Sequence, residues 1–201
     1  MDPAANEIID LYERHARAYS LDRAKSPFFE RSWLDRFKAT LVPDLPILDL
    51  GCGSAWPMAN YLIEEGLQVT GVDSSPSMIR LCELRFPDGN WIVADMRHVD
   101  LEIRFGGILA WDSFFHLSPE DQRTMFPIFR THSASGAALM FTSGPRHGEA
   151  IGSYRDEPLY HASLAAEEYT ALLDKHGFRV LQHVVEDADC GGHTVWLAQA
   201  R

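Results

Sequence analysis

Cysteine and long apolar runs are both scarce in this chain of 201 residues. The three cysteines, Cys52, Cys82 and Cys190, are too few and too widely spaced for a framework of disulfide bonds. The first ten residues, MDPAANEIID, lack the basic start and apolar core of a signal peptide. No apolar run approaches the roughly 20 residues that cross a bilayer. We therefore expect a cytoplasmic protein with no membrane partner.

Positive charge is scarce as well. The chain has 18 lysine and arginine residues against 29 aspartate and glutamate residues, for a formal net charge of −11 at pH 7. An acidic surface repels the phosphate groups of nucleic acids. We therefore expect no nucleic acid partner, although the charge alone leaves room for a local basic patch.

What is present is the composition of one ordinary globular domain. Hydrophobic residues make up 46% of the chain and charged residues 23%. This composition and length suffice for a full hydrophobic core. Internal repeats, low-complexity tracts and linkers are all lacking, so we predict a single domain.

The first two thirds of the chain alternate between strand and helix patterns. Apolar residues at spacings of three and four predict N-terminal helices over 4–18 and 30–41. The strands predicted after them are 46–51, 67–73, 90–96, 106–114 and 136–144, and the helices are 57–65, 75–86 and 118–134. We expect Pro127 to kink or shorten the last of these helices.

The last third has a different pattern. Residues 145–164 form an irregular stretch, and a helix is predicted over 165–176. Two strands over 178–187 and 193–201, joined by a Gly–Gly turn, predict a hairpin. The fold class is therefore α/β: a Rossmann-like, doubly wound, mostly parallel seven-stranded sheet with an antiparallel C-terminal strand and helices on both faces.

Two glycines separated by one residue interrupt the first strand in LDLGCGSAWP, residues 48–57. In a parallel sheet, ligands bind beyond the carboxyl ends of the strands, and Gly51 and Gly53 lie at such an end. Glycines there let the backbone approach a ligand and adopt turns that other residues resist. A tight strand-to-helix turn would explain the two glycines equally well.

Carboxylates at the ends of the next two strands favour a ligand. Asp73 ends the second strand, where a carboxylate can accept hydrogen bonds from both hydroxyls of a ribose. A helix cap is the alternative role for Asp73. At the third strand, the segment ADM over 94–96 offers a carboxylate and a backbone N–H to the edge of a base. Together the three strand ends predict a crevice that binds a nucleoside.

A dinucleotide does not suit this crevice. Dinucleotide sites have a third glycine that lets the helix pack closely on the strand near the pyrophosphate. Trp56 occupies that position here, and Pro57 follows it. NAD is therefore not expected.

The same segments resemble class I S-adenosylmethionine-dependent methyltransferases. ILDLGCGSA resembles their first motif, VTGVDSSPSMI the second, VADM the third, and GGILAWDSFFHLSPEDQ the region of the fourth strand. The resemblance runs from about Pro46 to the C-terminus. It departs at Ala55, where many members have a third glycine. It implies S-adenosylmethionine as methyl donor and S-adenosylhomocysteine as product.

The resemblance also implies roles at the methionine end of the donor. Asp49, Gly51, Cys52 and Gly53 should border the methionine part, and Trp111 should lie near the sulfonium.

For the adenosine end, the resemblance implies that Asp73 holds the ribose and that Ser74 and Met78 flank the adenine. Asp95 should accept a hydrogen bond from the adenine amino group, and Met96 should donate its backbone N–H.

The N-terminal region commonly closes over the donor in related enzymes. Tyr12, Tyr19, Arg23 and Trp33 could do so here, and Arg23 could pair with the methionine carboxylate. A purely structural role on the sheet is the alternative for each of them.

Histidines are the candidates for chemistry on the acceptor. Methyl transfer is an in-line displacement that needs alignment and exclusion of water, with a general base where the acceptor is a hydroxyl or an acidic carbon. His116, after the fourth strand, is the candidate catalytic residue, with a capping or packing role as the alternative. The residues expected to bind the acceptor are Phe115, His116, His147, Tyr160 and His161.

We divide the single domain into a helical cap (1–44), a cofactor-binding core (45–144), a substrate lid (145–164) and a C-terminal helix with hairpin (165–201). The predicted function is methyl transfer to a small molecule. The alternatives are a non-catalytic scaffold that binds the donor or product, and a protein or RNA methyltransferase, which would need an added recognition element. No metal is expected, because no Cys/His cluster has ligand spacing. The sequence leaves the acceptor atom and the oligomeric state open.

Overall fold

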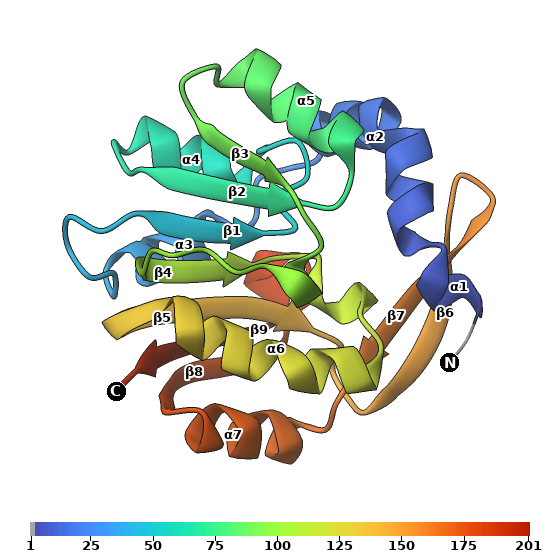
Figure 1. Cartoon of the computed structure of the whole chain (residues 1–201). Helices are drawn as coiled ribbons and strands as arrows, with labels where there is room; N and C mark the ends of the chain where they lie inside the picture. Colours follow the sequence, from blue (N-terminus) through green and yellow to red (C-terminus); the bar gives the residue numbers. More distant parts are fainter. Residues whose placement is uncertain (1–2) are drawn as a thin grey trace.

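The computed structural model describes residues 3–201 and is built on one seven-stranded sheet (Figure 1). Its order is β3-β2-β1-β4-β5-β9-β8, and β9 runs opposite to the other six strands. The strands are β1 Ile47–Leu50, β2 Val69–Asp73, β3 Asn90–Val93, β4 Phe105–Ala110, β5 Ser133–Ser143, β8 Phe178–Asp187 and β9 His193–Ala200. The predicted fold class is confirmed.

Helices cover both faces of this sheet (Figure 1). Phe126 of α6 and Tyr169 of α7 pack with the core of one face, whereas Phe37 of α3, Leu62 of α4 and Ile79 of α5 pack with the core of the other. The helices are α1 Pro3–Asn6, α2 Ile8–Lys25, α3 Arg31–Lys38, α4 Met58–Glu64, α5 Pro76–Arg85, α6 Pro119–His132 and α7 Ala166–Lys175, with short turns η1 Met96–His98, η2 Phe114–His116 and η3 Ala188–Cys190. Within residues 3–201, no helix is both long enough and apolar enough to span a membrane.

The stretch expected to be irregular over 145–164 is instead a second, two-stranded sheet. The strands β6 Gly148–Tyr154 and β7 Glu157–Ser163 pair antiparallel. Their turn consists of Arg155 and Asp156, at φ +51° and +66°. Tight hairpin turns of this hand usually contain glycine or asparagine. The sequence prediction was wrong here because neither residue is a common signal for such a turn.

Helix α6 also differs from its prediction. It continues through Pro127 and ends at His132, so the proline does not shorten it. The Ser118 hydroxyl caps its start by accepting a hydrogen bond from the N–H of Asp121. Phe126 and Phe129, on either side of the proline, are fully buried. Burial of this face offsets the one backbone hydrogen bond that proline cannot donate.

Helix α2 extends beyond its predicted end and is tied to α5. Its Glu13 carboxylate accepts hydrogen bonds from the hydroxyl of Ser75 at 2.5 Å and from both the N–H and the hydroxyl of Ser77 at 3.0 and 2.6 Å. These hydrogen bonds lower the pKa of Glu13. They anchor α2 at the start of α5, beside the ends of the parallel strands (Figure 1).

The β6–β7 hairpin holds α2 from the other side. Glu157 pairs with Arg14 and His15, and Asp22 pairs with Arg155 at 2.8 Å and accepts a hydrogen bond from Tyr154 at 3.0 Å. Helix α2 therefore bridges α5 and the hairpin, above the carboxyl ends of β1, β2 and β4.

The core makes a first prediction. Replacing Phe126 with alanine should lower the free energy of unfolding by about 3–5 kcal/mol, because the cavity left between α6 and the sheet cannot collapse fully. Urea denaturation followed by circular dichroism measures this change. The control is Leu84→Ala on α5, whose side chain is 73% exposed and should change stability by less than about 0.5 kcal/mol. Equal losses in the two variants would contradict this assignment of the core.

Candidate functional site

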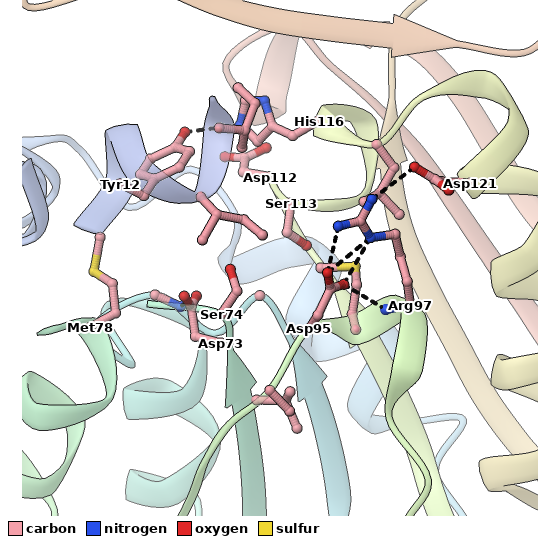
Figure 2. A pocket seen from close by; sticks show the side chains of 18 of the residues that line it. Tyr12, Asp73, Ser74, Met78, Asp95, Arg97, Asp112, Ser113, His116 and Asp121 are labelled. Atoms are coloured by element: carbon pink, nitrogen blue, oxygen red, sulfur yellow. Dashed lines mark hydrogen bonds and ion pairs between the residues drawn. The ribbon is translucent and has the colours of Figure 1, made fainter. Parts of the chain in front are cut away.

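A crevice lies where the strands β1 to β4 end, beneath α1 and α2 (Figure 2). The predicted residues that line it are Tyr19, Gly51, Gly53, Asp73, Ser74, Met78, Asp95, Met96 and His116. The fold thus brings together most residues that the sequence placed around a nucleoside. Residues of α1 and α2, including Asn6, Ile9 and Tyr12, close it from above.

The two glycines at the end of β1 serve different purposes. Both have positive φ, +75° at Gly51 and +53° at Gly53. A Cβ on Gly51 would lie 2.3 Å from the Cβ of Ser113. Glycine is therefore needed at position 51 because the Ser113 side chain, not a ligand, packs against its backbone. Above Gly53, the nearest atom to such a Cβ is a ring carbon of Tyr19 at 3.9 Å, which leaves the backbone open to the crevice.

Asp73 connects the glycine turn to α5. Its Oδ2 accepts a hydrogen bond from the N–H of Gly53 and its Oδ1 one from the N–H of Ser75, both at 2.9 Å. Burial raises the pKa of Asp73, and these two hydrogen bonds oppose the rise. Each carboxylate oxygen can accept a further bond from the crevice. The capping role and the ligand-binding role considered for Asp73 are therefore compatible.

Asp49 lies beneath the glycine turn rather than in the crevice. Its carboxyl is 2% exposed, and its Oδ2 has no hydrogen-bond partner within residues 3–201. Burial and the nearby charge of Asp73 raise the pKa of Asp49 to about 7. An unpartnered buried carboxyl is costly, and a cationic group nearby would favour its charged form.

Asp95 is engaged by an arginine that sequence reasoning missed. Arg97 contacts Asp95 through Nε at 3.0 Å and Nη2 at 2.5 Å, and Asp121 through Nη1 at 3.1 Å (Figure 2). Burial tends to raise the pKa of Asp95, but the bonds from Arg97 lower it overall. All three residues line the crevice. Arg97 directly follows Met96, and the chain's turn at η1 folds it back onto Asp95.

His116 is linked to Tyr12 of α2. Its Nδ1 donates a hydrogen bond to the carbonyl of Tyr160 at 2.7 Å, so its Nε2 accepts one from the Tyr12 hydroxyl at 2.9 Å (Figure 2). Burial lowers the pKa of His116 to about 4, against the effect of the Tyr160 carbonyl. His116 is therefore neutral at pH 7, with its tautomer determined by these two bonds.

A second pocket continues from the crevice toward β9. Tyr12, Tyr19, Asp112 and His116 line both pockets and form their junction. The other residues that line the second pocket include Phe115, Pro145, Leu159, His161 and His193. Phe115, His116 and His161, three of the residues expected to bind the acceptor, line this pocket together with Asp112 and His193, which the sequence did not single out.

Asp112 and His193 form an ion pair in this second pocket. The Nε2 of His193 lies 3.1 and 3.2 Å from the two carboxylate oxygens, and its Nδ1 donates to the carbonyl of Cys190 at 2.6 Å. Burial opposes the charge on His193, but the hydrogen bonds to Asp112 and Cys190 prevail and raise its pKa to about 11. His193 is therefore an imidazolium at pH 7.

Several predicted residues lie outside both pockets. Arg23 pairs with the buried carboxyl of Glu30 and lines neither pocket, so its expected contact with a methionine carboxylate stays a prediction. Trp111 and Tyr160 are buried, and His147 is exposed on the chain leading into β6. Cys52 is buried below the glycine turn. Across residues 3–201, no three His, Cys, Asp or Glu residues form a group that could hold a metal.

The sequence matches known methyltransferase sequences over the crevice. Residues 47–136 match the sequence model of the family described as a methyltransferase domain. The carboxy-S-adenosyl-L-methionine synthase of Vibrio vulnificus is 27% identical over 139 residues, which cover 65% of this chain and 56% of that protein. The chain therefore spans little more than half the length of the curated relatives it matches.

Several solved methyltransferase structures share this fold. The 1,6-didemethyltoxoflavin-N1-methyltransferase of Burkholderia thailandensis has a TM-score of 0.71 and 18% identity over 98% of this chain and 86% of its own. An amino pentose methyltransferase from Micromonospora echinaspora has a TM-score of 0.71 and 16% identity over 92% of this chain and 96% of its own. The predicted resemblance to class I methyltransferases is confirmed.

The Asp112–His193 pair predicts how stability changes with pH. The pKa of His193 is about 11 in the folded protein and about 6.5 in an unfolded chain, so the folded state holds the extra proton between these values. The stabilisation is complete below about pH 6.5 and declines as the pH rises toward 11. The loss of unfolding free energy caused by His193→Gln, measured in urea, should be smaller at about pH 9 than at about pH 6. A loss that is equal at both pH values would contradict the ion pair.

Proposed function

We propose that this chain is a class I methyltransferase and that it transfers a methyl group from S-adenosylmethionine to a small-molecule acceptor. The observation that carries the proposal is the convergence of Gly53, Asp73 and Asp95 from three strand ends in one crevice under α2. When bound, S-adenosylmethionine supplies an electrophilic methyl group on a sulfonium. The chain must hold the donor, align the acceptor and exclude water.

The chemistry of the crevice suits this donor. The free lone pairs of the Asp73 carboxylate can accept the ribose hydroxyls, and Asp95 can accept the adenine amino group while Arg97 holds it. The open backbone at Gly53 leaves space for the amino-acid end. The unpartnered oxygen of Asp49 lies under that turn and favours a ligand with a positive charge there.

Known structures with this fold support the donor. Among them, the glycopeptide N-methyltransferase is described with S-adenosyl-L-homocysteine, with sinefungin and with S-adenosyl-L-methionine. The Burkholderia thailandensis enzyme is described with S-adenosylhomocysteine and its small acceptor. We propose the same donor and product for this chain.

We propose that a small acceptor binds in the second pocket, beside Phe115, His116 and His161. Ion pairs of Glu157 and Asp22 join helix α2 to the β6–β7 hairpin, and residues 145–164 would then be the lid expected from the sequence.

The net charge of the chain, −11, disfavours RNA as the acceptor, because negative charges repel its phosphate groups. The three cysteines are free and buried, which is compatible with the proposed cytoplasmic location.

His116, the catalytic residue expected from the sequence, contacts Tyr12, and we propose that it acts through this tyrosine. His116 lines both pockets, and its Nε2 orients the Tyr12 hydroxyl at their junction. With a pKa of about 4, caused mainly by burial, it is a weak base at pH 7. We therefore assign it to positioning the Tyr12 hydroxyl, through which it would act on the acceptor. A non-catalytic scaffold that only binds the donor would not need the hydrogen bond between Tyr12 and His116.

Calorimetric titration tests the donor. Wild-type protein should bind S-adenosylmethionine and S-adenosylhomocysteine, and Asp73→Asn should weaken both by roughly 10- to 100-fold, because hydrogen bonds to a charged group contribute about 1.5–3 kcal/mol. The control is Asp88→Asn, a carboxylate that lines neither pocket. Unchanged affinity in Asp73→Asn would refute the ribose assignment. No binding to folded wild-type protein would refute the donor itself.

A further inference from the structure

Asp112 occupies an unusual position between the two pockets. It follows β4 and lines both the crevice and the second pocket, near Tyr12 and His116 (Figure 2). Its φ is +48°, in the left-handed region that few residues other than glycine adopt and that costs backbone energy. Such strain persists where the surrounding structure holds a residue in place, and it often marks a functional residue.

Two neighbours hold Asp112 in this conformation. Its N–H donates a hydrogen bond to the Thr142 hydroxyl of β5 at 2.9 Å, and that hydroxyl lies 3.4 Å from its Oδ1. His193 at the start of β9 contacts both carboxylate oxygens. The carboxyl remains 25% exposed, so its outer side faces the junction of the pockets.

His193 is itself held on both sides. Its Nδ1 is occupied by the Cys190 carbonyl, and its ring centroid lies 5.3 Å from that of Trp111. With both ring nitrogens donating, the imidazolium cannot accept a proton from an acceptor. Its position allows it to orient the Asp112 carboxylate rather than to act as a base.

We propose that Asp112 binds the nucleophilic atom of the acceptor, that His193 is the residue that positions it, and that the preferred acceptor is a neutral amine. This inference rests on the proposed methyl transfer. It concerns a part of the site that the donor assignment does not use.

A neutral amine and an alcohol differ in the charge that develops on the attacking atom during methyl transfer. The nitrogen lone pair of a neutral amine forms the new N–CH₃ bond while the S–CH₃ bond breaks and its electron pair stays on sulfur. The nitrogen becomes a cation that still carries its N–H, which it donates to Asp112 and afterwards loses to water. A carboxylate beside this atom stabilises the charge that appears in the transition state.

An alcohol would need a different set of residues. Its oxygen becomes a good nucleophile only as its proton leaves, which requires a well-placed base. The Nε2 of His116 already accepts the Tyr12 hydroxyl, and His193 has no free lone pair. Among the residues at the junction, Asp112 therefore offers a negative charge and a hydrogen-bond acceptor to an amine nitrogen that becomes positively charged.

Sinefungin tests this inference without knowledge of the acceptor. It is an analogue of S-adenosylmethionine in which a carbon bearing an amino group replaces the methylsulfonium, so it places an ammonium where methyl transfer occurs. Wild-type protein should bind sinefungin roughly tenfold more tightly than S-adenosylhomocysteine, because a charged hydrogen bond is added. Asp112→Asn should abolish this preference and change the affinity for S-adenosylhomocysteine less than about twofold.

Two further variants complete the experiment. His193→Gln should reduce the preference for sinefungin while leaving S-adenosylhomocysteine binding intact, which a general loss of folding would not do. The matched control is Glu83→Gln, an exposed carboxylate of α5 outside both pockets, which should leave the preference unchanged.

The outcomes separate the two proposals. If S-adenosylhomocysteine does not bind folded wild-type protein, the donor proposal fails and this inference fails with it. If it binds but sinefungin binds no more tightly, or if Asp112→Asn weakens both ligands equally, the donor proposal stands and the role of Asp112 is refuted.

Discussion

The crevice depends on the half-buried carboxylate of Asp73. By accepting the N–H groups of Gly53 and Ser75, it joins the turn after β1 to the start of α5. Ser75 then contacts Glu13, so the same connection reaches α2 above the crevice. A single side chain at the end of β2 therefore links the floor of the site to its cover, and it still presents lone pairs to a ligand.

Negative charge is the common property of the site, and it explains what kind of ligand suits it. Burial raises the pKa of Asp49 to about 7 and also raises that of Asp73, so a cationic group bound nearby would favour the charged form of both carboxyls. A donor with a sulfonium and an ammonium group would supply compensation. Asp95 and Asp112 are already balanced by Arg97 and His193, so these two pairs can hold their geometry while they accept further hydrogen bonds.

Most strands and helices, and the residues gathered at the strand ends, could be predicted because their signals are local. Ser75 followed by Pro76 marks a helix start that the structure confirms. Glycines and carboxylates at strand ends likewise lie within a few residues of the patterns that reveal them. The β6–β7 hairpin was missed because its turn residues, Arg155 and Asp156, give no local signal. The pairs Arg23–Glu30, Tyr12–His116 and Asp112–His193 depend on side-chain geometry, and the last two join positions 104 and 81 residues apart, which no periodicity links.

A crystal structure of the protein with S-adenosylhomocysteine tests the central claim most directly. Our account predicts the ribose hydroxyls on Asp73, the adenine beside Asp95, and the amino-acid end over Gly53. The sulfur would face the junction formed by Tyr12, Asp112 and His116. A ligand bound away from the strand ends, or one bound in the crevice with its sulfur directed away from Asp112, would contradict it.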